Sequence, residues 1–257
     1  MSKIISLHSF RGGTGKSNTT ANIAALLAAD GRRVGVVDTD IQSPGIHILF
    51  GLAGEQVSHA LNDYLWGKCK IEETAYDVSP ILRIDPGTVV VMGGGIYLIP
   101  SSIKAGEITR ILRDGYDVGM LNDGFRDLVT RLHLDYLMID THPGLNEETL
   151  LSIAISDTMV IIMRPDQQDY QGTAVTVDVA QRLEVPRMLM VVNKVLPESD
   201  FAAIRDEVEK TYGIPVAGIL PFSRDMIRLG SRGIFCLRFP DQPFSQCIRE
   251  IMARVIG

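Results

Sequence analysis

Near the start of the chain, a glycine-rich stretch carries a lysine and a serine at the spacing that binds phosphate. It reads Ser9-Phe10-Arg11-Gly12-Gly13-Thr14-Gly15-Lys16-Ser17. Glycines let backbone amides crowd around an anion, and a helix that starts there adds its partial positive charge. Lys16 is placed to reach the β- and γ-phosphates of a nucleotide, and the Ser17 hydroxyl to hold Mg²⁺. The stretch therefore predicts a nucleotide-binding loop.

Carboxylates follow two apolar runs elsewhere in the chain. Asp38 and Asp40 come at the end of the run 33–37, and Asp140 ends the run 134–139. In a parallel sheet the carboxyl ends of the strands meet at one edge, which is where ligands bind. One such carboxylate can hold Mg²⁺ and another can orient an attacking water. The residue types alone do not separate these two roles.

The elements on either side of the glycine-rich stretch favour this interpretation over an ordinary turn with a solvated lysine. Lys3 to His8 has the pattern of a short apolar strand, and Asn22 to Ala28 that of a helix. A strand, a glycine-rich loop, Gly-Lys-Ser and a helix in this order form the context that a phosphate-binding loop requires.

Strand and helix patterns alternate along the rest of the chain. Strands are expected at 33–38, 81–84, 88–92, 96–99, 134–140, 157–163, 187–192 and 216–220, and helices at 61–65, 103–112, 120–132, 170–182, 201–212 and 244–256. Asp85-Pro86-Gly87 and Gly93-Gly94-Gly95 predict turns, the second a hairpin. The alternation predicts an α/β fold with a doubly wound, mostly parallel sheet and helices on both faces. We expect one domain over 1–257.

Composition is ordinary for a soluble globular protein, with 46% hydrophobic and 22% charged residues among 257. No run of about 18 apolar residues predicts a membrane span, and the N-terminus has no signal-peptide pattern. Cys69, Cys236 and Cys247 are far apart and predict reduced thiols.

The net charge of −6 is unevenly distributed. From Arg224 to Gly257, six arginines face three acidic residues. This asymmetry is compatible with an anionic partner or with local salt bridges on a solvated face.

The loop resembles the deviant Walker A motif of the ParA/MinD family of ATPases. The common Walker A loop has glycine where this chain has Phe10, and the pattern here is Arg11-Gly12-Gly13-x-Gly-Lys-Ser. In that family the early basic residue is usually lysine and reaches the nucleotide of a partner subunit. Arginine keeps the charge and reach but offers a planar fork.

Other motifs carry the same resemblance. Asp38-Thr39-Asp40 is similar to the family's first switch, which implies that Asp40 positions water and Asp38 lies on the magnesium side. Asp140 ends a run similar to Walker B, and Pro143-Gly144 resembles the second switch. His142 is expected to be a switch-loop residue rather than a catalytic base.

The resemblance implies ATP and Mg²⁺ as cofactors. Lys16, Asp40 and Arg11 are the predicted catalytic residues, and Ser17, Asp38 and Asp140 the predicted metal site. The predicted nucleotide-binding residues are Gly12, Gly13, Thr14, Gly15, Lys16, Ser17 and Asn18 in the loop, with Asn193, Pro221 and Phe222 at the adenine.

The function implied by the resemblance is that of a positioning ATPase. It would form a nucleotide-sandwich homodimer, bind nonspecific DNA in the ATP state, and be released when an adaptor protein stimulates hydrolysis. A location in the cytoplasm at the nucleoid follows, and Arg11 is reminiscent of the carboxysome-positioning McdA branch. Alternatives are a membrane-associated MinD-like ATPase, a metal-cluster carrier and a dethiobiotin-synthetase-like enzyme. The segment 244–256 is expected to pack on the domain rather than to lie on a membrane.

Overall fold

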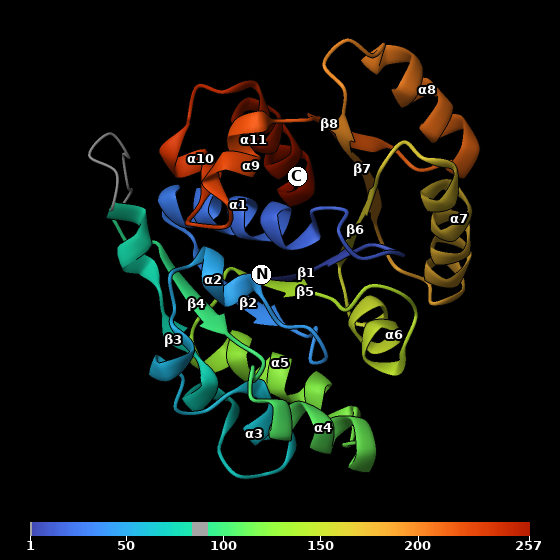
Figure 1. Ribbon diagram of the computed structural model, residues 1–257. Helices are drawn as coiled ribbons and strands as arrows, with labels where there is room; N and C mark the ends of the chain where they lie inside the picture. The colour runs from blue at the N-terminus through green and yellow to red at the C-terminus, as the bar shows by residue number, and fades with distance from the viewer. Residues whose placement is uncertain (1, 84–91) are drawn as a thin grey trace.

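A computed structural model describes residues 2–83 and 92–257. An eight-stranded sheet runs through the molecule in the order β3-β4-β2-β5-β1-β6-β7-β8, and every pairing is parallel except that of β3 with β4 (Figure 1). The strands are β1 (Lys3–His8), β2 (Arg33–Asp38), β3 (Tyr76–Asp77), β4 (Gly95–Ile99), β5 (Tyr136–Asp140), β6 (Thr158–Met163), β7 (Met188–Val195) and β8 (Val216–Pro221).

Helices fill most of the connections between strands. They are α1 (Lys16–Ala29), α2 (Ile46–Leu49), α3 (Leu61–Leu65), α4 (Ala105–Asp114), α5 (Gly119–Arg131), α6 (Glu147–Ala154), α7 (Gln167–Arg182), α8 (Phe201–Tyr212), α9 (Arg224–Leu229), α10 (Phe235–Arg238) and α11 (Pro243–Ile256). Three 3₁₀ turns add η1 (Gly54–Gln56), η2 (Ile71–Thr74) and η3 (Ser79–Arg83).

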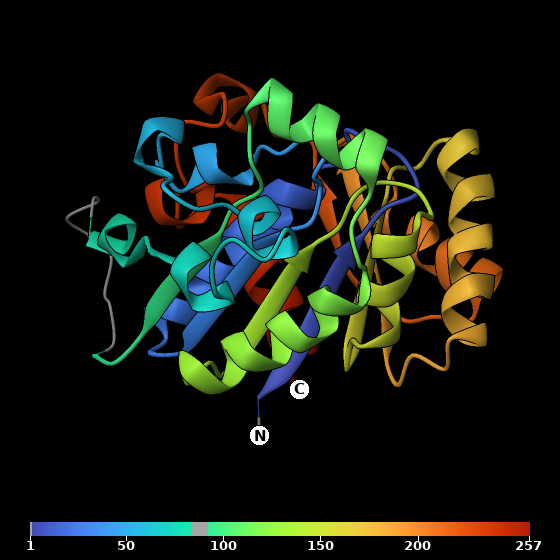
Figure 2. The same ribbon diagram turned by 90° about the horizontal axis from the view of Figure 1, so that it is seen from below.

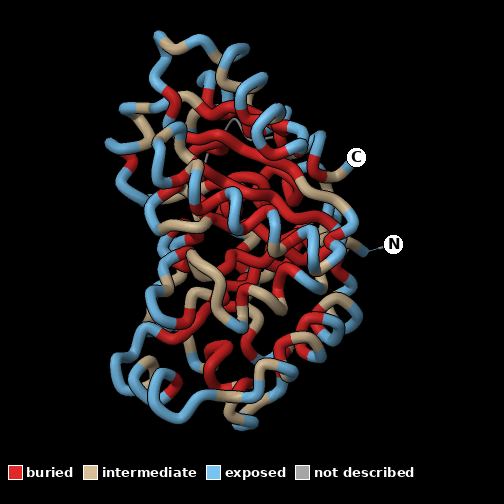
Figure 3. Tube along the Cα trace, turned by 90° about the vertical axis from the view of Figure 1, so that its right-hand side faces the viewer, coloured by how far each residue is buried: buried red, intermediate tan, exposed pale blue. Residues whose placement is uncertain are grey.

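The sheet is covered on both faces. Helices α1, α10 and α11 pack on one face, while α5, α6, α7 and α8 lie on the other (Figures 1 and 2). The strands are buried along most of their length, and exposed residues gather on the outer helices and loops (Figure 3). Strands enclosed in this way have continuous apolar sequences, such as Val34–Val37. The predicted doubly wound α/β fold is confirmed.

The central strand explains where a ligand can bind. β1 pairs with β5 on one side and β6 on the other, so the chain winds outward from β1 in both directions. The loop after β1 therefore opens at the carboxyl edge where the winding reverses, the usual ligand-binding position of such sheets.

The region before β4 differs from the prediction. Ile81 lies in the 3₁₀ turn η3 with its side chain buried, not in a strand, and Ile84 lies outside the described residues. The turn expected at Asp85-Pro86-Gly87 lies wholly outside the described residues. The strand expected at 88–92, which is the first strand of the expected hairpin, lies outside them except for Met92. Packing explains why residue 94 is glycine, because a Cβ there would overlap the carbonyl oxygen of Ala28.

The last helix packs as expected. Phe244, Ile248, Ile251 and Val255 of α11 are buried against β8 and α1. The structure therefore confirms packing of this segment on the domain. Among the described residues, no helix combines the length and apolarity needed to cross a membrane.

Candidate functional site

The glycine-rich loop joins β1 to α1 and leaves its backbone amides at the start of a long buried helix. Gly13 and Gly15 have φ values of 76° and 96°, which residues other than glycine rarely adopt. A Cβ on Gly15 would also overlap the amide of Asn193. α1 begins at Lys16 without a side-chain cap, so its first N–H groups point toward the loop. This local structure suits a bound phosphate group.

Phe10 has a structural role in this loop. Its ring packs on Gly172 of α7, where a Cβ would overlap the ring. This contact ties the start of the loop to the second half of the sheet. Because Gly172 has no side chain, α7 leaves room for the Phe10 ring.

A buried ion pair lies at the centre of the site. The Lys16 Nζ lies 2.7 Å from Asp140 Oδ1, and the Thr20 hydroxyl donates to the same oxygen at 3.2 Å. Lys16 and Asp140 are 7% and 1% exposed. A buried pair of this kind is costly to break unless a new partner replaces the lost one. The phosphate groups of a nucleotide are such a partner for Lys16.

Asp38 and Asp140 lie side by side because β2 and β5 pair in register at these residues. Burial, and next the negative charge of Asp140, raise the pKa of Asp38 to about 7. The Asp38 carboxylate accepts from the backbone N–H groups of Asp40 at 3.0 Å and Gly45 at 3.1 Å. Two carboxylates crowded in a dry place favour a cation between them.

The predicted metal residues suit Mg²⁺ by their donor types. Ser17 begins the same helix as Lys16, so a hydroxyl and two carboxylates share one edge of the sheet. In residues 2–83 and 92–257, no three or more His, Cys, Asp or Glu side chains are grouped so that they could hold a metal ion by themselves. Mg²⁺ bound by few protein ligands, with phosphate and water completing the shell, matches this arrangement.

Asp40 is more accessible than Asp38 and faces the second predicted switch. Its Oδ1 lies 3.7 Å from His142 Nε2 and accepts from the backbone N–H of Ser43 at 3.0 Å. Burial raises the pKa of Asp40, whereas the neighbouring His142 acts in the opposite direction. His142 lies in the loop after β5, and its proximity to a carboxylate is a feature that the sequence did not predict.

Below the loop, His8 is fully buried and hydrogen-bonded to the Thr141 hydroxyl at 2.8 Å. Burial, together with the charges of Lys16 and His142, lowers the pKa of His8 to about 3. The ring is therefore neutral at physiological pH and connects β1 to the loop after β5.

Arg11 points toward carboxylates of its own chain. Its Nη1 lies 3.4 Å from Asp166 and 3.3 Å from Asp169, which also pair with Arg164. Asp169 is 2% exposed, while the Arg11 side chain remains about a third exposed. The family resemblance implies that Arg11 reaches a partner's nucleotide, but here carboxylates at the start of α7 hold it.

A cavity of about 340 Å³ adjoins the loop on the side of β7 and β8. It is lined by the predicted residues Gly13, Gly15, Asn18, Asn193, Pro221 and Phe222, and by Lys194, Ser223, Met226, Ile227, Gly230, Ser231 and Phe244. Phe222 is 37% exposed at its rim. The structure therefore brings the three predicted adenine residues to the loop.

Asn193 and Lys194 both contact the loop backbone. The Asn193 amide donates to the Thr14 carbonyl at 2.8 Å, and Lys194 Nζ donates to the Gly13 carbonyl at 2.7 Å. Sequence reasoning did not assign a role to Lys194, Thr20, Asp166 or Asp169. Thr20 follows Lys16 by one helical turn, a signal that was present, whereas the other contacts depend on the tertiary fold.

The three cysteines do not gather. Cys236 is buried, Cys69 and Cys247 are partly exposed, and all three are free thiols. Burial raises the pKa of Cys236 to about 12 and that of Cys69 to about 11. These thiols are therefore poor thiolates, in keeping with the predicted reduced state.

Comparison with known proteins gives a family and a fold. The model of the "CobQ/CobB/MinD/ParA nucleotide binding domain" matches residues 5–235. An uncharacterized ATP-binding protein of Methanocaldococcus jannaschii is 28% identical over 100% of this chain and 89% of its own length.

Solved structures share the fold over nearly the whole chain. MinD from Pyrococcus horikoshii, complexed with Mg-ADP, has a TM-score of 0.80 at 21% identity and covers 99% of this chain and 96% of its own. MinD in the MinC:MinD complex of Aquifex aeolicus has a TM-score of 0.81 at 18% identity. The match covers 100% of this chain and 96% of that one. Apo McdA from Cyanthece has 0.76 at 17%, covering 100% of both chains.

Proposed function

Because the chain belongs to the CobQ/CobB/MinD/ParA family of nucleotide-binding proteins, we propose that it is an Mg²⁺-dependent ATPase that positions a cargo on DNA. In this proposal, residues 1–257 act as one domain and dimerise with ATP sandwiched between two subunits. The observation that carries the proposal is the meeting of Lys16, Asp38, Asp40 and Asp140 at the mouth of the glycine-rich loop.

Nucleotide binding would use groups that the chain already presents. The amides of residues 12–18 would surround the phosphates, and Lys16 would turn from Asp140 toward the β- and γ-phosphates. Asn193, Pro221 and Phe222 would enclose the adenine in the adjoining cavity. Mg²⁺, held by Ser17, Asp38 and Asp140, would neutralise phosphate charge. Release of Asp140 by Lys16 would make that carboxylate available to the metal.

Hydrolysis would depend on Asp40. Its carboxylate lies in the first switch, beside His142 of the second, where it can accept a hydrogen bond from an attacking water. Arg11 would leave Asp166 and Asp169 to reach the nucleotide of the second subunit. A slow intrinsic rate is expected while Arg11 remains with these carboxylates. An adaptor protein that favours the released arginine would stimulate hydrolysis.

The C-terminal arginines support DNA as the surface. All of them are exposed: Arg224, Arg228, Arg232, Arg238, Arg249 and Arg254. Arginine contacts with phosphates bind DNA without sequence preference and weaken with salt. The apolar face of α11 is already packed against β8 and α1, so it is not presented to a lipid surface. A location at the nucleoid follows from this proposal.

The deciding experiment measures binding to a random-sequence DNA duplex with ATP, with ADP and without nucleotide, at low and moderate salt. The proposal expects DNA binding in the presence of ATP but not with ADP or without nucleotide. It also expects the affinity for DNA to fall as the salt concentration rises. Anionic phospholipid vesicles provide the second arm. Absence of DNA binding in every nucleotide state would overturn the proposal, and ATP-dependent vesicle binding would replace it with the MinD-like alternative. ATP turnover that depends on an added small molecule would instead favour a metabolic enzyme.

A further inference from the structure

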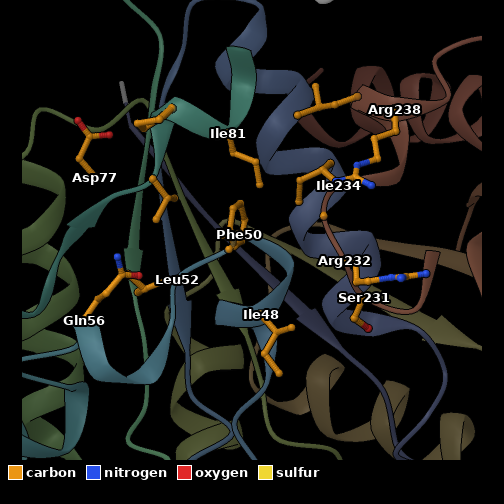
Figure 4. Close-up of a pocket in the computed structure, with 15 residues that line it drawn as sticks. Ile48, Phe50, Leu52, Gln56, Asp77, Ile81, Ser231, Arg232, Ile234 and Arg238 are labelled. Carbon is orange, nitrogen blue, oxygen red and sulfur yellow. The ribbon is translucent and has the colours of Figure 1, made fainter. Parts of the chain in front are cut away.

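A second cavity, of about 570 Å³, lies away from the phosphate-binding loop. Three segments form its walls: the chain from α2 to η1, the stretch from β3 to η3, and the connection from α9 to α10 (Figure 4). Its volume is in the range that small ligands occupy. Ser231 also lines the cavity next to the loop, so the two cavities share a wall.

The lining of this cavity is mainly apolar. Figure 4 shows Phe50, Ile81 and Ile234 arranged around its centre, and these residues are at most 7% exposed in the folded chain. Ile48 also lines the cavity and is 54% exposed. An apolar molecule placed here would contact these side chains and cover part of Ile48, and burial of its own apolar surface would stabilise the complex.

A positive charge lies at the edge of the apolar surface. The Arg238 guanidinium lies beside Ile234 in Figure 4 and packs on Gly233, whose Cβ, if present, would lie 3.2 Å from its Nε. Within the part of the chain that the structure describes, neither Arg238 nor Arg232 has a carboxylate within 4.0 Å. Arg232 donates instead to the Leu229 and Arg228 carbonyls.

Asp77 is the one carboxylate among the described residues that line this cavity, and it already has local partners. Asp77 accepts from the backbone N–H of Ser79 at 2.9 Å and from its hydroxyl. It lies across the cavity from Arg238 in Figure 4. The local charge near Ile234 is therefore positive, and it complements an anion rather than a cation.

We infer that this cavity binds a small amphipathic anion, with an aromatic or aliphatic body among Phe50, Ile81 and Ile234 and one carboxylate or sulfonate on Arg238. Such a ligand matches both the apolar lining and the Arg238 guanidinium, which has no carboxylate within 4.0 Å among residues 2–83 and 92–257. This inference does not depend on ATP hydrolysis, and of the six C-terminal arginines it uses Arg238 alone, so the proposed DNA surface keeps the other five. It assigns a function to the segments after the first switch and after the adenine-side loop.

The test uses anilinonaphthalene sulfonate, a fluorescent probe with an apolar aromatic body and one negative charge. Titration of the full chain at saturating Mg-ATP, which would fill the cavity beside the loop, should show saturable binding of the probe. Arg238→Gln should weaken the probe about tenfold, the size of one charge-assisted hydrogen bond. Phenylnaphthylamine, a neutral analogue, should bind native and Arg238→Gln chains equally. Decanoate should displace the sulfonate probe.

Two further variants complete the design. Ile48→Asn alters an exposed wall residue and should weaken both probes, with folding checked by circular dichroism. Arg182→Gln, on exposed α7 and paired with Asp178, should change neither. The inference is overturned if the sulfonate probe does not bind, if ATP displaces it, or if Arg238→Gln and Arg182→Gln behave alike.

Discussion

The charges at the nucleotide-binding edge and the charges of the C-terminal region are held in opposite ways. Lys16 and Asp140 are 124 positions apart in sequence, yet they form a buried pair at 2.7 Å. Arg228 pairs with Asp225 only three positions away, on the exposed helix α9. Removing one member of a buried pair leaves an uncompensated charge, whereas an exposed pair contributes little. The edge is therefore fixed by the fold, whereas the exposed pair on α9 adds little to stability.

The largest effect expected from this comparison is that of Lys16→Ala. Loss of the ammonium removes charge-assisted hydrogen bonds to the phosphates, so ATP affinity should fall by at least about a hundredfold. Isothermal titration with Mg-ATP measures it. Lys210→Ala, an exposed lysine on α8, is the control and should bind normally. Unchanged affinity in Lys16→Ala would refute the assignment of the loop.

Asp40→Asn should separate binding from hydrolysis. The amide is a weaker hydrogen-bond acceptor for the attacking water, so turnover should drop about a hundredfold while ATP affinity stays within about twofold. Steady-state phosphate release and nucleotide titration give the two values. Asp30→Asn, at the exposed end of α1, should match the native rate. Normal turnover in Asp40→Asn would transfer the water-positioning role to another group, with His142→Gln as the next variant.

His8→Asn should sharpen the contrast through pH. The folded pKa of His8 lies below its unfolded value, so the unfolded chain takes up the proton first as pH falls. This contribution is complete above about pH 6.5 and should be lost toward pH 3, at about 1.4 kcal/mol per pH unit. Urea unfolding from pH 7.5 to pH 5 measures it. Asparagine keeps a hydrogen-bonding group for the Thr141 hydroxyl but does not titrate. If the variant lost unfolding free energy as steeply as the native chain when the pH falls, the prediction would be contradicted.

The smallest effects should come from the exposed arginines. Arg224→Gln and Arg249→Gln should each lower DNA affinity by a few-fold at moderate salt and reduce the slope of log K against log salt by about one. Unfolding free energy should stay within about 0.5 kcal/mol, since both side chains are exposed. An unchanged salt slope in both variants would place the DNA contact elsewhere.

Much of the fold was predictable because its strands are short, apolar and bounded by strong signals. β1, β2 and α8 have the predicted bounds, and each lies between glycine, aspartate or other turn-forming residues. Ile81 was misassigned because an apolar residue before a turn fits a strand or a 3₁₀ helix equally well. The short helices α2 and α10 have too few residues for a periodic pattern, and packing on α1 decides their conformation.

The sequence by itself predicted the chemistry of the site, and the family to which the chain belongs bears out its nucleotide-binding part. A glycine-rich loop followed by Lys16, and aspartates at the ends of apolar runs, predict phosphate and magnesium binding because parallel strands bring their carboxyl ends to one edge. Only the tertiary structure decided the partners of these charges: Lys16 on Asp140, Arg11 on Asp166 and Asp169, Asp40 beside His142. Contacts between distant segments depend on register and burial, which local patterns do not encode. For the same reason the cavity beside Arg238, built from three separate segments, has no sequence signature.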